Sequence, residues 1–156
     1  MATASPIELD AAEPYAEAAA RTISVRADEL IEHSGHVLDT SDIEHVHDMR
    51  VATRRLRAAL EVFEPCFPRK KFRRVLRDVK RLADALGERR DRDVTIKALR
   101  GFGAEMAGAD RSGIDVLTEK LRAEQRQANA ELEPLVTREA VSELRLRLAS
   151  LAETAR

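Results

Sequence analysis

The chain has 156 residues, 44% of them hydrophobic, and its 27 basic and 28 acidic side chains nearly cancel. Only 3% are aromatic and tryptophan is absent, so the composition argues against a sheet protein and for an all-α fold. The length suits a single domain over residues 1–156. No apolar run of about 18 residues occurs, and Met1–Asp10 lacks the basic start and apolar stretch of a signal peptide. We therefore expect a cytoplasmic protein without a membrane span, an expectation that the single cysteine, Cys66, also fits.

The charges are divided unevenly along the chain. The part before Arg50 has 2 basic and 11 acidic residues, Arg50–Arg100 has 17 and 7, and the remainder has 8 and 10. A strongly basic middle between acidic arms predicts a localised anion site. The alternative is that the acidic arms neutralise the basic middle through ion pairs between helices.

The first half of the chain predicts two helices. Residues 1–13, with Pro6 and followed by Pro14, are expected to form a poorly ordered lead, and an alanine-rich helix follows from Tyr15 to His33, where Ser34-Gly35 ends it. Ser41-Asp42-Ile43-Glu44 has the form of a capping box, so the next helix begins near Asp42. Its apolar stripe has the 3–4 spacing of one helix face: Val46, Met49, Thr53, Leu56, Leu60 and Phe63.

Beside that stripe lies a line of basic side chains, within a sector of roughly 80° on the helix surface. We name it the first basic row, and it consists of His47, Arg50, Arg54 and Arg57. Basic groups stacked about every 5 Å repel one another, and a bound polyanion would relieve the repulsion.

The third helix repeats this design. Prolines at 65 and 68 end the second helix, and Arg69 begins the next, whose apolar stripe is Phe72, Val75, Val79, Leu82 and Leu86. The second basic row runs alongside and consists of Lys70, Arg73, Arg77 and Lys80, with Arg74 and Arg81 adjacent. Helices joined by a short loop lie antiparallel, so the two rows are expected to flank one groove. Arginine forks and lysine ammonium groups in such a groove suit a chain of phosphates.

Five of the six glycines lie after Leu86. Gly87 predicts a stop, and Asp91 or Asp93 then caps a short helix that ends at Gly101. The two aspartates are interleaved with arginines, which favours a structural role over metal binding. The range 101–113 predicts a flexible connector, and two amphipathic helices come next, one before Pro134 and one after Thr137. Their apolar stripes are Ile114, Leu117, Leu121, Ala128 and Leu132, and then Val141, Leu144, Leu148 and Leu151. The fold expected is an antiparallel bundle of about four long helices plus a short helix after Gly87.

Two strings in the basic middle resemble a known family. VHDMRVATRRLRAALEVF (46–63) and ALGERRDRDV (85–94) are similar to the H-x-x-R-V-x-x-R-R-L-R…L-x-x-F and L-G-x-x-R-D-x-D-V motifs of the conserved-histidine α-helical domain (CHAD) family. The resemblance implies a helical bundle that binds inorganic polyphosphate on basic helix faces without catalysis. Proteins of this family usually carry two such bundles facing each other across a basic cavity, whereas this chain holds the motifs of the first half. It therefore resembles a short or half-length member.

The resulting hypothesis is a cytoplasmic polyphosphate-binding module that uses both basic rows, with no cofactor and no metal, at or near polyphosphate granules. A homodimer is expected to supply the opposite wall of the groove. Three alternatives stay open. They are a histidine phosphotransfer bundle using His47, a sequence-blind nucleic-acid binder, and an enzyme acting on phosphoanhydrides. The arginines near His47 exceed what phosphotransfer requires, and neither stacking aromatics nor metal-holding carboxylates accompany the rows.

Overall fold

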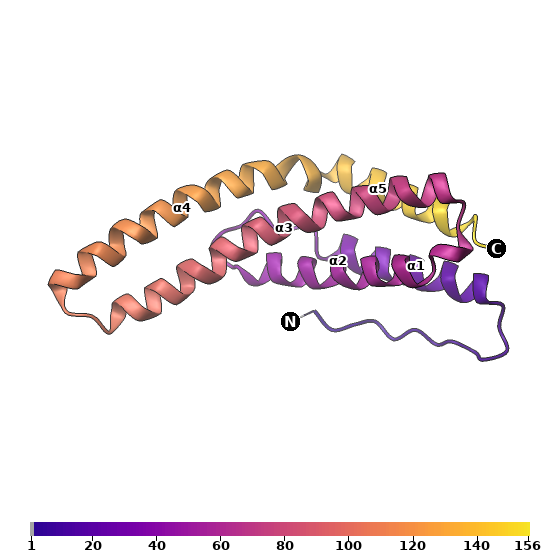
Figure 1. Ribbon diagram of the computed structural model, residues 1–156, viewed down its shortest axis with the longest axis horizontal. Helices are drawn as coiled ribbons and strands as arrows, with labels where there is room; N and C mark the ends of the chain where they lie inside the picture. Colours follow the sequence, from indigo (N-terminus) through magenta and orange to yellow (C-terminus); the bar gives the residue numbers. More distant parts are fainter. Residues whose placement is uncertain (1) are drawn as a thin grey trace.

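The computed structural model describes residues 2–156 and contains five α-helices and one short 3-10 helix in that range (Figure 1). The elements are α1 (Tyr15–Glu32), α2 (Glu44–Val62), η1 (Glu64–Cys66), α3 (Arg69–Ala104), α4 (Gly108–Val136) and α5 (Arg138–Ala152). No strand occurs in the described part of the chain, so the predicted all-α bundle is confirmed.

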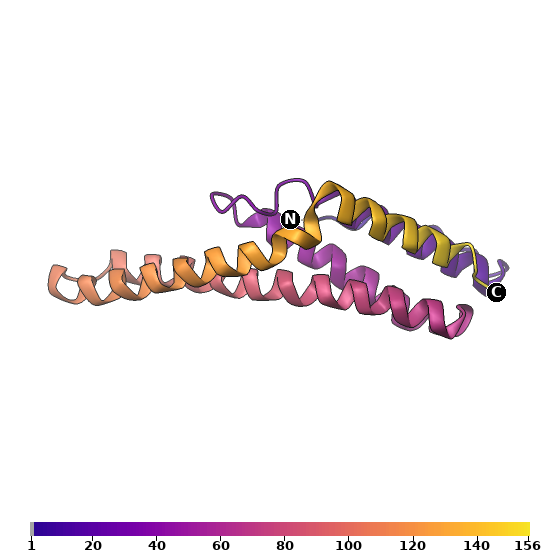
Figure 2. The ribbon, with the colours of Figure 1, turned by 90° about the horizontal axis from the view of Figure 1, so that it is seen from above.

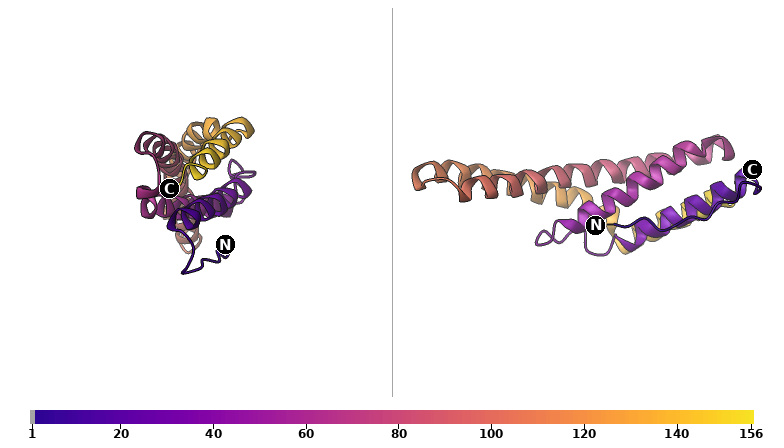
Figure 3. Two further views of the ribbon diagram at one scale, coloured as in Figure 1. Left: turned by 90° about the vertical axis from the view of Figure 1, so that its right-hand side faces the viewer. Right: turned by 90° about the horizontal axis from the view of Figure 1, so that it is seen from below.

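Four helices make the bundle, and a hairpin formed by α3 and α4 extends beyond it. α1, α2, α5 and the first half of α3 pack together, as the end-on view shows (Figure 3). α2 and α3 lie on the side that faces the viewer in Figure 1, with α1 and α5 behind them (Figure 2). The second half of α3 and most of α4 form a hairpin that projects past the ends of α1 and α2. α5 follows α4 directly, with a change of direction at Thr137, whose hydroxyl accepts a hydrogen bond from Ala140 N–H (3.1 Å).

The core consists of the predicted apolar stripes. Both stripes of α2 and α3 are buried along their whole length, and so is that of α5. Cys66 and Phe67 close the end where α2 passes into α3. Burial raises the pKa of the Cys66 thiol, which keeps it in its unreactive neutral form. Of the predicted stripe of α4, Ala128 and Leu132 are buried, Ile114 and Leu121 are only partly buried, and Leu117 is 44% exposed, because that end of α4 belongs to the projecting hairpin.

The prediction of a helix stop at Gly87 is wrong, and with it the short separate helix that was expected to follow. α3 continues through Gly87 for 36 residues, a rod of about 54 Å. A glycine costs a helix interior only about 1 kcal/mol, and Leu86 and Arg89, both wholly buried beside it, stabilise the helix on either side. The flexible connector expected over 101–113 shrinks in the same way to residues 105–107, between α3 and α4.

The start of α2 also differs from its prediction. A capping box is not formed, since Ser41 Oγ donates to Asp39 Oδ1 (2.7 Å) and α2 has no side-chain cap. Instead, Glu44 N–H donates to Asp42 Oδ1 (3.0 Å), which satisfies one free amide of the first turn. Hydrogen bonds from Ser41 lower the pKa of Asp39, because they stabilise its ionised carboxylate. That carboxylate helps to hold the loop before α2 in place.

The segment before α1 contains no helix or strand, yet it is held against the bundle. Ala2 is buried, with its N–H donating to Asp48 Oδ1 (2.7 Å) and its carbonyl accepting from Arg55 (3.0 Å). Ser5 N–H donates to the Glu29 carboxylate. Burial acts to raise the pKa of Glu29, but the hydrogen bonds from Arg26 and Ser5 and the Arg26 charge lower it overall. Residues 2–13 therefore make more contacts than the predicted lead implied, while Met1 lies outside the described residues.

A buried ion pair within α3 connects this helix to the loop between α1 and α2 and to α4. Arg89 and Asp93 have fully buried side chains, and Arg89 Nε donates to Asp93 Oδ1 at 2.9 Å. Arg89 also donates to the Val37 carbonyl (3.1 Å) and to the Asn129 amide oxygen, and Gln125 donates to Asp93 Oδ1 (2.6 Å). The loop between α1 and α2 is thereby tied to α3 and α4. The predicted structural role of the 91–93 aspartates, to fix arginines, is confirmed for Asp93.

Two glycines of α3 give opposite predictions. A Cβ at Gly87 meets no heavy atom within 4 Å, so Gly87→Ala should stabilise the fold by about 0.5 to 1 kcal/mol through helix propensity. At Gly103 a Cβ would lie 2.9 Å from Ile114 Cγ2, so Gly103→Ala should destabilise the hairpin. Urea unfolding of the two variants measures both effects. A destabilised Gly87→Ala protein would contradict the continuous helix.

Removing one member of the ion pair should be costly. Asp93→Ala leaves the Arg89 guanidinium buried without its carboxylate, a change worth about 3 to 5 kcal/mol of unfolding free energy. Asp84→Ala, at an exposed position of the same helix, is the matched control and should stay within about 0.5 kcal/mol of wild type. Equal losses in the two variants would show that the buried pair has no special role.

Candidate anion-binding site

The first basic row lies on the flank of α2 next to α3. At about 100° per residue, Arg50, Arg54 and Arg57 follow the apolar stripe on one side, while Asp48 and Arg55 lie on the other. The latter two contact Ala2 of the N-terminal segment, which covers that other flank. The first row is thus left uncovered on the α2–α3 face.

The register of α2 and α3 is set by hydrogen bonding at one end. Arg90 of α3 donates to the Ile43 carbonyl at the start of α2 (3.1 Å), and its guanidinium lies 3.9 Å from the Glu44 carboxylate. One turn further along α2 is His47, and one turn back along α3 is Gly87. These two positions therefore lie alongside each other, and the open space at Gly87 is at the His47 end of the first row.

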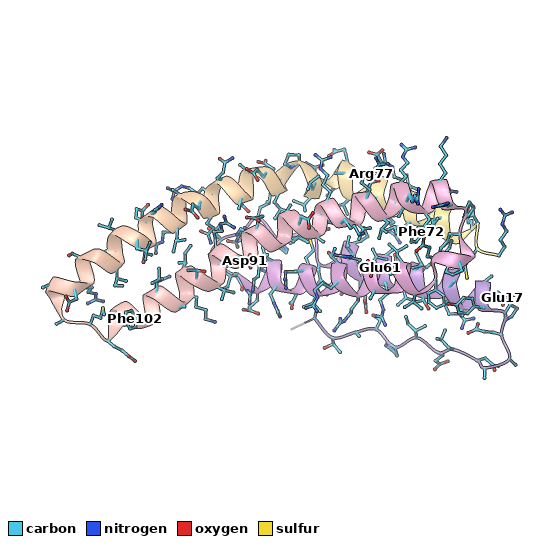
Figure 4. The ribbon with its side chains drawn as sticks, viewed as in Figure 1. Glu17, Glu61, Phe72, Arg77, Asp91 and Phe102 are labelled. Atoms are coloured by element: carbon cyan, nitrogen blue, oxygen red, sulfur yellow. The ribbon has the colours of Figure 1, made fainter. Side chains whose placement is uncertain are left out.

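The second basic row is divided between two directions. Arg73 and Lys80 lie within about 20° of each other on the flank of α3 nearer α2. Lys70 and Arg77 point some 40° to 80° further round, towards solvent. All four side chains are exposed, and Arg77 is labelled in Figure 4. The fold thus places half of the second row beside the first row, and the other half on the adjoining surface.

Most of these cations have no partner among the residues that the structure describes. Among residues 2–156 no hydrogen bond or ion pair is formed by the side chains of His47, Arg50, Arg54, Lys70, Arg73, Arg77 and Lys80. The exception is Arg57, whose Nε donates to Glu61 Oε1 at 2.9 Å on the exposed surface of α2. Three further exposed arginines of α3 are equally unpaired with described residues, namely Arg69, Arg74 and Arg81.

Many of the arginines elsewhere in the described chain are paired. Arg147 contacts Asp78 (2.6 Å), Arg145 contacts Asp28 (2.9 Å), and Arg92 contacts Glu88 and, at 3.6 Å, Glu124. The acidic arms therefore do form ion pairs with arginines of this chain, but not with those of the two basic rows. Neutralisation by internal ion pairs, the alternative considered from the sequence, does not occur over most of the α2–α3 face.

The remaining candidate residues take structural or surface positions. The His36 and His45 rings lie 5.4 Å apart near the start of α2, and His45 is 3.7 Å from Asp42. Asp91 is exposed on α3 (Figure 4), whereas Asp93 is in the buried pair. Within residues 2–156 no group of three or more His, Cys, Asp or Glu side chains is arranged to hold a metal ion.

A cavity outside the two rows was not anticipated from the sequence. It has a volume of about 730 Å³ and lies between the start of α2, the second half of α3 and α4. Its basic lining comes from Lys97 and Arg100 of α3 and Arg122 and Arg126 of α4. The sequence signal that could have indicated this cavity is the continuation of the α3 stripe beyond Gly87. It was missed because a helix stop was predicted at Gly87.

The described chain is thus a helical bundle with a cationic face that its own carboxylates leave largely unneutralised. Comparison with protein families identifies the class of protein: the model of the CHAD domain matches residues 21–156. The chain belongs to the CHAD family, which is known for binding polyphosphate. No curated protein matches the chain closely enough to add a relative. In the described part of the chain, no helix is both long and apolar enough to cross a membrane.

Proposed function

We propose that this protein binds inorganic polyphosphate along the α2–α3 face, using the first and second basic rows, and that it does so without turnover. The observation that carries the proposal is the set of unpaired cations on that face, in a chain whose other arginines are mostly paired. A protein gains nothing in stability from such self-repulsion, and a linear polyanion removes it.

The chemistry of the rows favours phosphate over other anions. Arginine binds phosphate oxygens through two parallel N–H groups, and the exposed lysines add mobile charges. No aromatic side chain stands among the rows, so there is no platform on which a nucleobase could stack. Duplex DNA would meet only phosphate contacts, which are weak at physiological salt and blind to sequence.

Binding without catalysis is the interpretation that the neighbouring side chains support. Hydrolysis of a phosphoanhydride needs a positioned base or carboxylates that hold a metal. Glu61 is engaged by Arg57 and Asp78 by Arg147, while the exposed Asp84, one turn after Lys80, belongs to no group of three described side chains that could hold a metal ion. A phosphotransfer role for His47 is disfavoured because the half-buried imidazole is followed by two unpaired arginines.

A single open face leaves a bound polyanion in contact with water, where each ion pair contributes only about 0 to 1 kcal/mol. We propose that a second copy of the chain closes the groove with its own rows, about a twofold axis. Polyphosphate would itself neutralise the two like-charged faces. Dimer formation should therefore depend on the ligand.

Arg50→Ala combined with Arg54→Ala should weaken polyphosphate binding by about 2 kcal/mol or more, because both side chains are unpaired and lie beside α3. Titration calorimetry with long polyphosphate, orthophosphate and duplex DNA at two salt concentrations measures this effect and the ligand preference. Light scattering on the same samples reports whether two copies associate.

The matched control is Arg111→Ala with Arg138→Ala. These arginines are also exposed, removal of the pair gives the same change in charge, and they begin α4 and α5, outside the rows. Polyphosphate affinity should change little in this control. Equal weakening in both double variants would mean that net charge, and not the α2–α3 face, controls binding.

His47 should make polyphosphate binding depend on pH. A phosphate chain at the end of the first row favours the imidazolium form, so affinity should fall as pH rises from about 6 to 8. In His47→Ala the slope of affinity against pH should become shallower over that range. An unchanged slope would exclude His47 from the binding site.

A further inference from the structure

The cavity at the base of the projecting hairpin has a lining unlike that of the basic rows. Ile43 and Ile96 supply apolar surface, and Asp93 and Gln125 supply polar groups between them. Lys97, Arg100, Arg122 and Arg126 surround these residues. A volume of about 730 Å³ is within the range of small-molecule sites, and a mixture of apolar walls with a few polar groups is typical of them.

One buried polar atom in this lining is unsatisfied. Asp93 is 1% exposed, and its Oδ1 accepts hydrogen bonds from Arg89 and Gln125. Its other oxygen, Oδ2, has no partner among the described residues. A buried carboxylate oxygen without a donor is destabilising, so it is matched to a ligand that carries an O–H or N–H group.

The cations of the cavity favour a ligand that also carries a negatively charged group. Lys97 and Arg100 are exposed and form no ion pair with any residue in 2–156. Arg122 and Arg126 share the exposed Glu119 at 4.0 and 3.7 Å, so each keeps donors for another partner. Of the acidic lining residues, Glu44 is near Arg90 (3.9 Å) and Asp42 near His45 (3.7 Å). Ile43 and Glu44 also place the positive end of the α2 dipole at this cavity.

We propose that this cavity binds a nucleoside phosphate. The phosphate pairs with Lys97 and Arg100, a ribose hydroxyl donates to Asp93 Oδ2, and the base lies against Ile43 and Ile96. Inorganic phosphate would leave the apolar walls uncovered, and a carboxylic acid without hydroxyl groups would leave Asp93 unsatisfied, whereas a nucleoside phosphate uses all three features. The site is separate from the two basic rows, and the proposal stands independently of polyphosphate binding.

The test is calorimetric titration of the full chain with AMP, adenosine and inorganic phosphate. AMP should bind at least about tenfold more tightly than either fragment, because it alone reaches both the cations and Asp93. Lys97→Gln with Arg100→Gln should weaken AMP binding by about tenfold or more and leave polyphosphate affinity within about twofold. The matched control is Arg73→Gln with Arg77→Gln, the same charge change on the same helix, and it should leave AMP binding unchanged.

Methyl chemical shifts of Ile43 and Ile96 supply a second measurement that does not depend on any variant, and AMP should move both. Absence of AMP binding to the wild-type chain would overturn the proposal, with an ordered water then satisfying Asp93. Equal loss of AMP binding in both double variants would also overturn it, since the nucleotide would then be on the basic rows. Because polyphosphate affinity is measured separately, its failure and the failure of this proposal are distinguishable.

Discussion

The buried pair of Arg89 and Asp93 is the interaction on which the arrangement of the molecule depends. Burying two charges is expensive, and here the cost is offset because both groups also form hydrogen bonds, to the Val37 carbonyl, to Asn129 and from Gln125. Those partners belong to two other parts of the chain, the loop after α1 and α4. The network fixes the loop after α1 and therefore the point at which α2 starts, which in turn sets how α2 lies against α3. Apolar contacts alone would tolerate other registers, whereas a single geometry satisfies this set of donors and acceptors.

Charge is distributed by a consistent division of roles. Most of the described arginines outside the α2–α3 face are bound to carboxylates or to backbone carbonyls, and several of them hold parts of the fold to one another. On that face the cations repel one another, and the packing of the two apolar stripes underneath supplies the stability that keeps them together. Functional sites commonly hold such unfavourable arrangements, which the rest of the fold supports.

The amino-acid pattern was sufficient for most of the helices, because an apolar stripe at 3–4 spacing determines which side of a helix remains outside, but it did not reveal that the second basic row is divided between two directions. The pattern was insufficient where a helix end was predicted from a single residue. Gly87 has a low helix propensity, but its neighbours are buried, and the stripe continues through it as Leu82, Leu86, Arg89, Asp93 and Ile96. Because Arg89 and Asp93 are charged, this part of the stripe is not recognised as a buried face from the sequence. Which arginines lack a carboxylate partner also escaped prediction, since ion pairs such as Arg147 with Asp78 join helices far apart in the chain.

The projecting hairpin gives one helix two different stabilities. The first half of α3 is surrounded by α2 and α5, so its amides can open only when the bundle itself unfolds. The second half has α4 as its neighbour, and its tip is closed by Gly103 against Ile114, with Phe102 exposed (Figure 4). Local opening of the tip leaves the bundle intact. The distal part of α3 can thus fray and reform on its own timescale, while the α2–α3 face stays rigid at the other end of the same continuous helix.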